Sequence, residues 1–362
     1  MTQGEIWVLG ATGRVGRAVA AQLVAAGAVP VLVGRDAPRL RGTAAALGLH
    51  GDARIVVAAG ADAMAAEITR QRPAVVVNTI GDYAAGAVPL ARACLPGGHY
   101  LDQANDPTAF HRLFALHDEA VAAGSTLVTG AGFGVAGTEA IVARLCANRP
   151  VPSRVRVDAF ASVAVEEGVL GVALATSIVD GFAMGGRRYE GGRLVRTRLG
   201  GEVHRLTLPD GARVSAVAVP SGELVAAHRV SGARSVSATS GLVPESPAVR
   251  AVLPLLSAIL RVRAVRTFAI GRMSRIRART APRPRPHTWG HAVVTWPDGT
   301  VREGWLRTGD AMDFTSAVAA QTALQLSAGK GRPGAHTPAA ALGPEIAVAA
   351  GADFVDDAVP RS

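Results

Sequence analysis

The clearest candidate for chemistry is a glycine-rich segment near the amino terminus. An apolar run at Ile6–Leu9 ends in Gly-Ala-Thr-Gly-Arg-Val-Gly at residues 10–16, where a helical pattern begins. A tight turn there needs glycine, and the missing side chains let backbone amides approach a pyrophosphate at the helix N-terminus. With a strand before it and a helix after it, the segment predicts dinucleotide binding rather than a glycine-rich turn without ligand.

The end of the second expected strand, Pro30–Val33, indicates which dinucleotide binds. Gly34-Arg35-Asp36 follows it. An acidic residue at this point accepts from the ribose 2′-hydroxyl of NAD, whereas arginine pairs with the 2′-phosphate of NADP. Arg35 favours NADP(H), with help from Arg14 and Arg39; in the alternative, Arg35 is solvated and Asp36 takes the hydroxyl. The expected cofactor contacts are Gly10, Thr12, Gly13, Arg14, Val15, Gly34, Arg35, Asp36, Thr79 and Gly81.

Polar residues follow two later strands of the same region. The run at Ala74–Thr79 leads into Gly81, Asp82 and Tyr83, and the next strand ends at Asp102. The carboxyl ends of parallel strands meet at the edge where ligands bind. We therefore expect these three polar side chains to be catalytic, supplying or relaying a proton. In the alternative for Asp82, its carboxylate only caps the following helix.

Lysine and cysteine usage exclude several classes of site. The single lysine, Lys330, is followed by Gly331 rather than by serine or threonine, which excludes a phosphate-binding P-loop. No tyrosine lies four residues before Lys330, which excludes a Tyr-x-x-x-Lys dyad. Cys94 and Cys146 are isolated, so we expect neither a metal site nor a disulfide framework, and a reducing cytoplasm fits. We expect no signal peptide and no membrane span, because no apolar run approaches ~20 residues.

Length and element order predict the architecture. The 362 residues suggest about two domains, and 49% hydrophobic residues suffice for a large core. Alternating strand and helix patterns in the first part predict a Rossmann-type, doubly wound parallel sheet. The middle part predicts an α+β domain on a mostly antiparallel sheet, and a helical tail follows. The expected domains are residues 1–150 with 308–362, which bind NADP, and residues 151–307, which meet substrate or partner.

The net charge of +10 is concentrated in one segment. Between Ser246 and Trp296 the sequence has ten arginines and no acidic residue, and the 28 other basic residues balance the 28 acidic ones. Such an arginine stripe, Arg250–Arg285, suits an anionic substrate, an acidic carrier protein, an anionic membrane or nucleic acid. Nucleic acid is the weakest option, because Phe268 is the stripe's single aromatic residue. Packing of the helix near Pro247–Val262 on the core, with arginines at its rim, is the structural alternative.

Taken together, these segments resemble the saccharopine dehydrogenase-like family, which includes trans-acting enoyl reductases. The matching segments are Gly10–Gly13, Gly34–Arg35, Val77–Tyr83, Tyr100–Asp102, Gly130–Phe133 and Thr337–Ala340. The resemblance covers residues 1–148 and the tail, and it implies an NADP-dependent reduction of a C=C or C=N bond. Two departures stand out: Asp82 replaces the family's frequent proline, and Gly134 replaces a frequent aspartate.

The sequence thus predicts an NADP(H)-dependent oxidoreductase that reduces a C=C or C=N bond. Its expected substrate is a small anionic or carrier-linked metabolite of specialised metabolism, with an acidic carrier protein at the arginine stripe as one partner and a homodimer as one assembly. The competing hypothesis is a non-catalytic NADP-binding sensor or scaffold, which keeps the glycine loop but needs no acid–base groups.

Overall fold

The computed structural model describes residues 4–49, 53–165, 167–169, 171–242 and 246–355. The chain divides into two compact units. The first unit contains Met1–Ala104, Thr108–Gly132 and Met312–Gly351, and the second contains Asn105–Pro107, Phe133–Ala311 and Ala352–Ser362.

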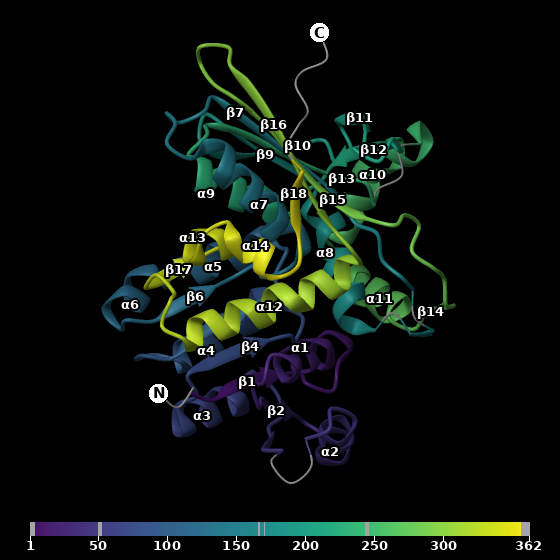
Figure 1. Cartoon of the computed structure of the whole chain (residues 1–362). Helices are drawn as coiled ribbons and strands as arrows, with labels where there is room; N and C mark the ends of the chain where they lie inside the picture. The colour runs from purple at the N-terminus through teal and green to yellow at the C-terminus, as the bar shows by residue number, and fades with distance from the viewer. Residues whose placement is uncertain (1–3, 50–52, 166, 170, 243–245, 356–362) are drawn as a thin grey trace. The chain divides into compact units, whose positions relative to one another are not determined.

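A seven-stranded sheet forms the centre of the first unit (Figure 1). Its strands are β1 (Ile6–Leu9), β2 (Val31–Gly34), β3 (Ile55–Val57), β4 (Val75–Asn78), β5 (His99–Asp102), β6 (Thr126–Val128) and β17 (Gly334–His336). They lie in the order β17-β6-β5-β4-β1-β2-β3, and all neighbouring pairs run parallel. β1, β2 and β4 are buried over their whole length, as expected for a parallel sheet covered on both faces.

Helices lie between these strands in the chain and after the last of them. They are α1 (Arg14–Ala25), α2 (Ala37–Ala46), α3 (Ala61–Gln71), α4 (Tyr83–Ala93), α5 (Pro107–Phe114), α6 (His117–Ala122), α12 (Ala311–Ser327), α13 (Pro338–Leu342) and α14 (Glu345–Ala349). The chain runs outward from β1 through β2 to β3 and then crosses back to β4, so the strand order reverses between β1 and β4. This reversal creates the switch point at which doubly wound sheets bind ligands. The predicted Rossmann-type sheet is confirmed.

The second unit is built on a larger, mostly antiparallel sheet of nine strands. Its members are β7 (Arg154–Phe160), β9 (Gly186–Glu190), β10 (Arg193–Thr197), β11 (Val203–Thr207), β12 (Arg213–Ala218), β13 (Ser235–Ser240), β15 (Thr288–Thr295), β16 (Val301–Thr308) and β18 (Asp353–Val355). β13 and β7 are its parallel pair. β8 (Gly168–Val169) and β14 (Arg277–Ala278) form a separate short ribbon. The predicted α+β class of this region is confirmed.

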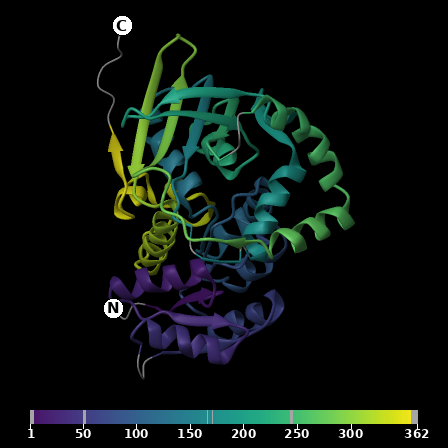
Figure 2. The ribbon, with the colours of Figure 1, turned by 90° about the vertical axis from the view of Figure 1, so that its right-hand side faces the viewer.

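Five helices accompany this sheet: α7 (Phe133–Cys146), α8 (Val172–Met184), α9 (Gly222–Ser231), α10 (Pro247–Leu260) and α11 (Arg263–Met273). α7 packs against β15, β16 and α9, and α9 also contacts β13 and β7. α8, α10 and α11 pack on one another, and Figure 2 shows α10 and α11 as two green helices joined by a short turn.

The contacts divide the chain differently from the expected boundary at residue 150. α7 belongs to the second unit, because its apolar residues are buried against that unit's sheet and against α9. β18 also lies there, because it pairs with β16. The end of the chain is therefore shared: β17 extends the first sheet beside β6, and β18 extends the second.

Candidate functional site

The glycine loop between β1 and α1 has little space for side chains. Gly10 has a φ of +77°, and a Cβ on it would lie 2.9 Å from the Thr79 Oγ1. A Cβ on Gly16 would lie 2.3 Å from the Gly10 carbonyl oxygen. The N-cap of α1 is Gly13, which has no side chain to place over the first turn of the helix. A helix N-terminus that opens directly from a glycine loop is a ready site for a phosphate.

Thr79 holds this loop against the neighbouring strand. Its hydroxyl and its backbone N–H both donate to the Leu9 carbonyl, at 2.7 and 3.2 Å. The predicted cofactor contact at Thr79 therefore has an observed structural role, because it joins the end of β4 to the end of β1 directly under Gly10. Gly81 lies on the segment that leaves β4 at this same edge.

Arg35 and Asp36, which follow β2, have different surroundings. Asp36 is the N-cap of α2 and accepts from the Arg39 backbone N–H at 3.0 Å. Arg35 is exposed immediately after the strand. The carboxylate therefore already has a backbone partner, while the guanidinium faces solvent. With the glycine cradle, an exposed arginine at this position fits a nicotinamide dinucleotide carrying a 2′-phosphate.

Asp82 and Tyr83 start α4 at the carboxyl end of β4. Asp82 is exposed and left-handed, with a φ of +62°, and its side chain makes no cap hydrogen bond with the residues that the structure describes. The alternative of a simple helix cap therefore lacks its hydrogen bond. Backbone strain of this kind in a residue other than glycine is concentrated at functional sites. Tyr83 is half-buried, and burial, followed by the negative charge of Asp102, raises its pKa above the usual range, so the phenol stays protonated.

Asp102 lies at the end of β5 and is fully buried. Oδ1 accepts from the Thr129 hydroxyl at 2.7 Å and from the backbone N–H groups of Ala104 and Gly130 at 3.0 and 3.3 Å. Oδ2 accepts from the Tyr100 hydroxyl at 3.1 Å. Burial raises the pKa of Asp102, and these four donors offset only part of that effect. The predicted catalytic carboxylate is thus part of an internal hydrogen-bond network.

The network continues to the segment that carries Asp82 and Tyr83. Asn78 Nδ2 donates to the Tyr100 hydroxyl at 2.9 Å, and Asn78 Oδ1 accepts from the Ile80 N–H at 3.0 Å. A line of hydrogen bonds therefore joins Asp102 to the backbone just before Gly81.

Sequence reasoning missed the roles of Asn78, Tyr100 and Thr129 in this network. A signal was present: Asn78 ends a run of three valines, and Thr129 follows an equally buried strand. Polar residues that end buried parallel strands lie together at one edge, where they need hydrogen-bond partners.

A different buried carboxylate accounts for the glycine at position 134. A Cβ on Gly134 would lie 1.9 Å from Glu223 Oε1, so Glu223 of α9 fills the space beside the first turn of α7. Burial raises the pKa of Glu223, and the nearby polar side chains of Ser221 and Asn105 oppose this effect. The second unit thus places an acid from another helix where a side chain at 134 would lie.

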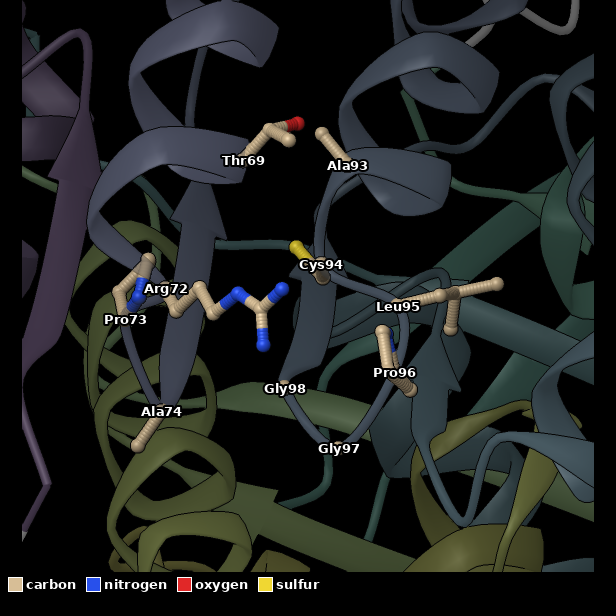
Figure 3. Close-up of a pocket in the computed structure, with 10 residues that line it drawn as sticks. All are labelled: Thr69, Arg72, Pro73, Ala74, Ala93, Cys94, Leu95, Pro96, Gly97 and Gly98. Atoms are coloured by element: carbon tan, nitrogen blue, oxygen red, sulfur yellow. The ribbon is translucent and has the colours of Figure 1, made fainter.

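A pocket of about 140 Å³ lies at the opposite edge of the first sheet (Figure 3). Its walls come from the ends of α3 and α4 and the segments leading into β4 and β5, and they include Arg72, Cys94 and Gly98. The Arg72 side chain extends into it between the two walls. Because ligands of doubly wound sheets bind at the carboxyl ends of strands, this pocket is separate from the candidate cofactor site.

Within the described residues, no group of three or more His, Cys, Asp or Glu side chains is arranged to hold a metal ion. None of the described helices is both long and apolar enough to cross a bilayer.

Comparison with known proteins agrees with this geometry. Residues 6–128 match the family model described as the saccharopine dehydrogenase NADP binding domain. No curated protein matches the chain in sequence. Apo histidine-tagged saccharopine dehydrogenase (L-Glu forming) from Saccharomyces cerevisiae is similar over 97% of this chain and 100% of its own, with 11% identity and a TM-score of 0.59. L-sorbose reductase from Gluconobacter frateurii matches 35% of this chain and 68% of its own, with 19% identity and a TM-score of 0.29.

The fold and the glycine-loop site define a nicotinamide nucleotide-dependent oxidoreductase with a Rossmann-type domain. Residues 6–128 match the model of the saccharopine dehydrogenase NADP binding domain, and the chain as a whole has the fold of the saccharopine dehydrogenase from Saccharomyces cerevisiae.

Proposed function

We propose that the protein is an NADPH-dependent reductase of a C=C or C=N bond in a small anionic or carrier-linked metabolite of specialised metabolism. The observation that carries the proposal is the arrangement of Asp82, Tyr83 and the Asp102 network beside the glycine loop, at one edge of one sheet. A protein that only sensed NADP would need the loop but not a strained, exposed carboxylate and a protonated phenol at this edge.

Each residue has a distinct role in this proposal. Arg35 binds the 2′-phosphate, and the first turn of α1 binds the pyrophosphate. Bound NADPH supplies the hydride. Tyr83, whose phenol keeps its proton, donates that proton to the substrate atom that does not receive the hydride, and exposed Asp82 relays a replacement proton from solvent. Asp102 is a positioning residue, because its oxygens accept from protein donors and its network orients the segment after β4.

The cofactor assignment is tested by titrating NADPH fluorescence against the Arg35→Ala variant. Loss of one charge-assisted contact should weaken NADPH binding at least tenfold while leaving NADH binding within about twofold. Arg41→Ala is the matched control, since Arg41 is also exposed and lies on α2. Unchanged NADPH affinity in Arg35→Ala would remove Arg35 from the site.

The reductase assignment is tested by NADPH oxidation with a panel of unsaturated and imine carboxylates, coenzyme A esters and carrier-bound acyl groups. Tyr83→Phe should then lower kcat by about 10²-fold or more with NADPH affinity retained, because general acid catalysis contributes effects of that size. NADPH binding without oxidation by any member of the panel would favour the sensor or scaffold hypothesis. An active panel member with full activity in Tyr83→Phe would instead move the proton donor elsewhere.

A further inference from the structure

Helix α10 presents an apolar face to solvent. Its most exposed large side chains are Val249, Val252, Leu255 and Ile259, at 40, 57, 63 and 45%, and Val262 follows the helix at 55%. Their spacing of three to four residues puts them on one side of the helix. Every other described residue that is exposed on α10 is alanine or proline.

The opposite side of α10 is also apolar, because Leu253 and Leu260 are buried there together with Ser257. A helix that is apolar on all sides is normally enclosed by protein or membrane. α10 packs on α8 and α11 through one side, and its other side has no cover in the described structure. Scattered exposed apolar residues are ordinary, but a continuous stripe of four along one helix, with a fifth directly after it, indicates an interaction surface.

The arginines of the stripe fall into two groups. The first group anchors the helices: Arg250 donates to the Gly200 and Gly201 carbonyls, Arg261 to the Ala183 carbonyl, and Arg266 forms a two-bond ion pair with Asp180. The second group is exposed on α11 and beyond it. Its members are Arg263, Arg272, Arg275, Arg277, Arg279 and Arg283. An apolar stripe is therefore followed by a run of exposed cations without an acidic residue among them.

We propose that the exposed face of α10, with the exposed arginines that follow it, docks on the surface of an anionic lipid bilayer. The apolar side chains would enter the boundary between headgroups and acyl chains, while the guanidinium groups would pair with lipid phosphates. The inference does not depend on the proposed reduction.

The dimensions of α10 fit binding in the plane of the membrane. Its 14 residues span about 21 Å, which is shorter than the roughly 30 Å hydrocarbon core. This agrees with the finding that none of the described helices could span a bilayer. Docking would therefore be peripheral, through one helix face and its neighbouring charges.

Two protein partners fit this surface less well. A second copy related by twofold symmetry would place the arginine run near its own counterpart, and the segment from Ser246 to Trp296 offers no carboxylate to neutralise it. An acidic carrier protein would match the charge, but it would leave an aliphatic stripe along a whole helix facing a polar partner. A bilayer accommodates both the stripe and the cations.

The test is co-sedimentation of the full chain with vesicles of phosphatidylcholine alone and of phosphatidylcholine with about one third phosphatidylglycerol. We expect binding to the anionic vesicles that weakens with added salt. Replacing Leu255 and Ile259 together by serine should reduce it at least tenfold, because two exposed apolar anchors are lost. Arg272→Gln should reduce it about fivefold. Val57→Ser with Val301→Ser is the matched control, since both valines are similarly exposed outside α10.

Sedimentation at rising protein concentration and a pull-down with an acidic acyl carrier protein complete the design. Equal binding by the Leu255/Ile259 variant, or no binding to either vesicle, would overturn the proposal. Self-association or carrier binding that the Leu255/Ile259 variant abolishes, without any vesicle binding, would also overturn it and assign the surface to that partner. NADPH affinity, measured in every variant, should be unchanged and shows that the variants are folded.

Discussion

Two aspartates, one in each unit, are completely buried, and yet the pKa of one is raised and the pKa of the other is lowered. Asp102 of the first unit accepts from two backbone N–H groups and two hydroxyls, and its pKa is raised. Asp158 of the second unit is equally buried, and its pKa is lowered. The difference lies in the donors, since the first carboxylate meets only neutral groups and the second meets cations.

The surroundings of Asp158 explain its lowered pKa. Burial alone would raise it, but His291 Nδ1 lies 2.6 Å away, Arg156 Nε lies 3.1 Å away and the Thr239 hydroxyl also donates. The other ring nitrogen of His291 lies 2.7 Å from a Glu303 carboxylate oxygen. Burial lowers the pKa of His291, and the two carboxylates reverse this effect and raise it. We therefore assign His291 as an imidazolium that donates to both acids.

The comparison shows that polarity alone does not keep a buried acid ionised. The four neutral hydrogen bonds of Asp102 leave its pKa above the usual value, because they offset only part of the effect of burial. Full positive charges hold Asp158 ionised inside a sheet, where the cluster joins β7, β15 and β16. The raised pKa of Asp102 and the lowered pKa of Asp158 therefore follow from the neutral donors around the first carboxylate and the cations around the second.

The largest expected effect comes from removing the acid that faces cations. Asp158→Ala leaves the buried His291 and Arg156 without their shared partner, and it should lower the free energy of unfolding by about 3–5 kcal/mol. Urea unfolding followed by circular dichroism measures this. Asp118→Ala, at an exposed position on α6, should stay within about 0.5 kcal/mol. A loss below about 1 kcal/mol for Asp158→Ala would mean that the cations are solvated.

Asp102→Asn should have a smaller effect, about 1–3 kcal/mol. The amide oxygen can still accept from Thr129 and the backbone, but its NH₂ group would face the Tyr100 hydroxyl, which already accepts from Asn78. Tyr100 would then lose its acceptor. The same urea experiment measures the loss, and Tyr100→Phe in the Asp102→Asn background should recover part of it. A loss as large as that of Asp158→Ala would show that Asp102 is ionised and paired with a charge.

The two aspartates also make the free energy of unfolding depend on pH in opposite directions. Each proton contributes up to about 1.4 kcal/mol per pH unit. The stability from Asp158 and Glu303, whose pKa values are lowered, is present above about pH 4 and is lost as the pH falls. The stability from His291, whose pKa is raised, is complete below about pH 6.5 and is lost as the pH rises through its folded value. Asp102, with a raised pKa, makes the fold less stable as the pH rises from about 4.

His291→Gln separates these contributions. The variant should be less stable at neutral pH and should lose the decline in unfolding free energy that wild type shows above about pH 6.5. His111→Gln, at an exposed position on α5, should keep that decline. An unchanged slope in His291→Gln would show that His291 is neutral in the folded protein.

The fold could be predicted where it depends on sequence patterns within a short stretch of the chain. The glycine loop and the order of strands and helices in the first unit both depend on residues close together in the sequence. The network around Asp102 was found only in part, because it depends on which strand ends lie side by side.

The cluster in the second unit was not predictable, because 133 positions separate Asp158 from His291 and only the pairing of β7 with β15 brings them together. Packing of α10 on the core, with arginines at its rim, was the structural alternative to an anionic partner. One side packs in this way, and the exposed apolar side could not be inferred from composition alone.

We expect the smallest effect on stability at Asp82. A substitution there should change activity without changing the stability of the fold. Asp82 is exposed and left-handed, so Asp82→Asn removes its charge while keeping a residue that tolerates this backbone conformation. Its unfolding free energy should change by less than about 0.5 kcal/mol. If Asp82 relays protons from solvent, kcat for NADPH oxidation should fall about tenfold or more, while NADPH affinity stays constant. Asp62→Asn on α3 is the exposed control. Full activity in Asp82→Asn would leave Tyr83 as the sole proton donor of the three groups and would reduce Asp82 to a strained turn residue.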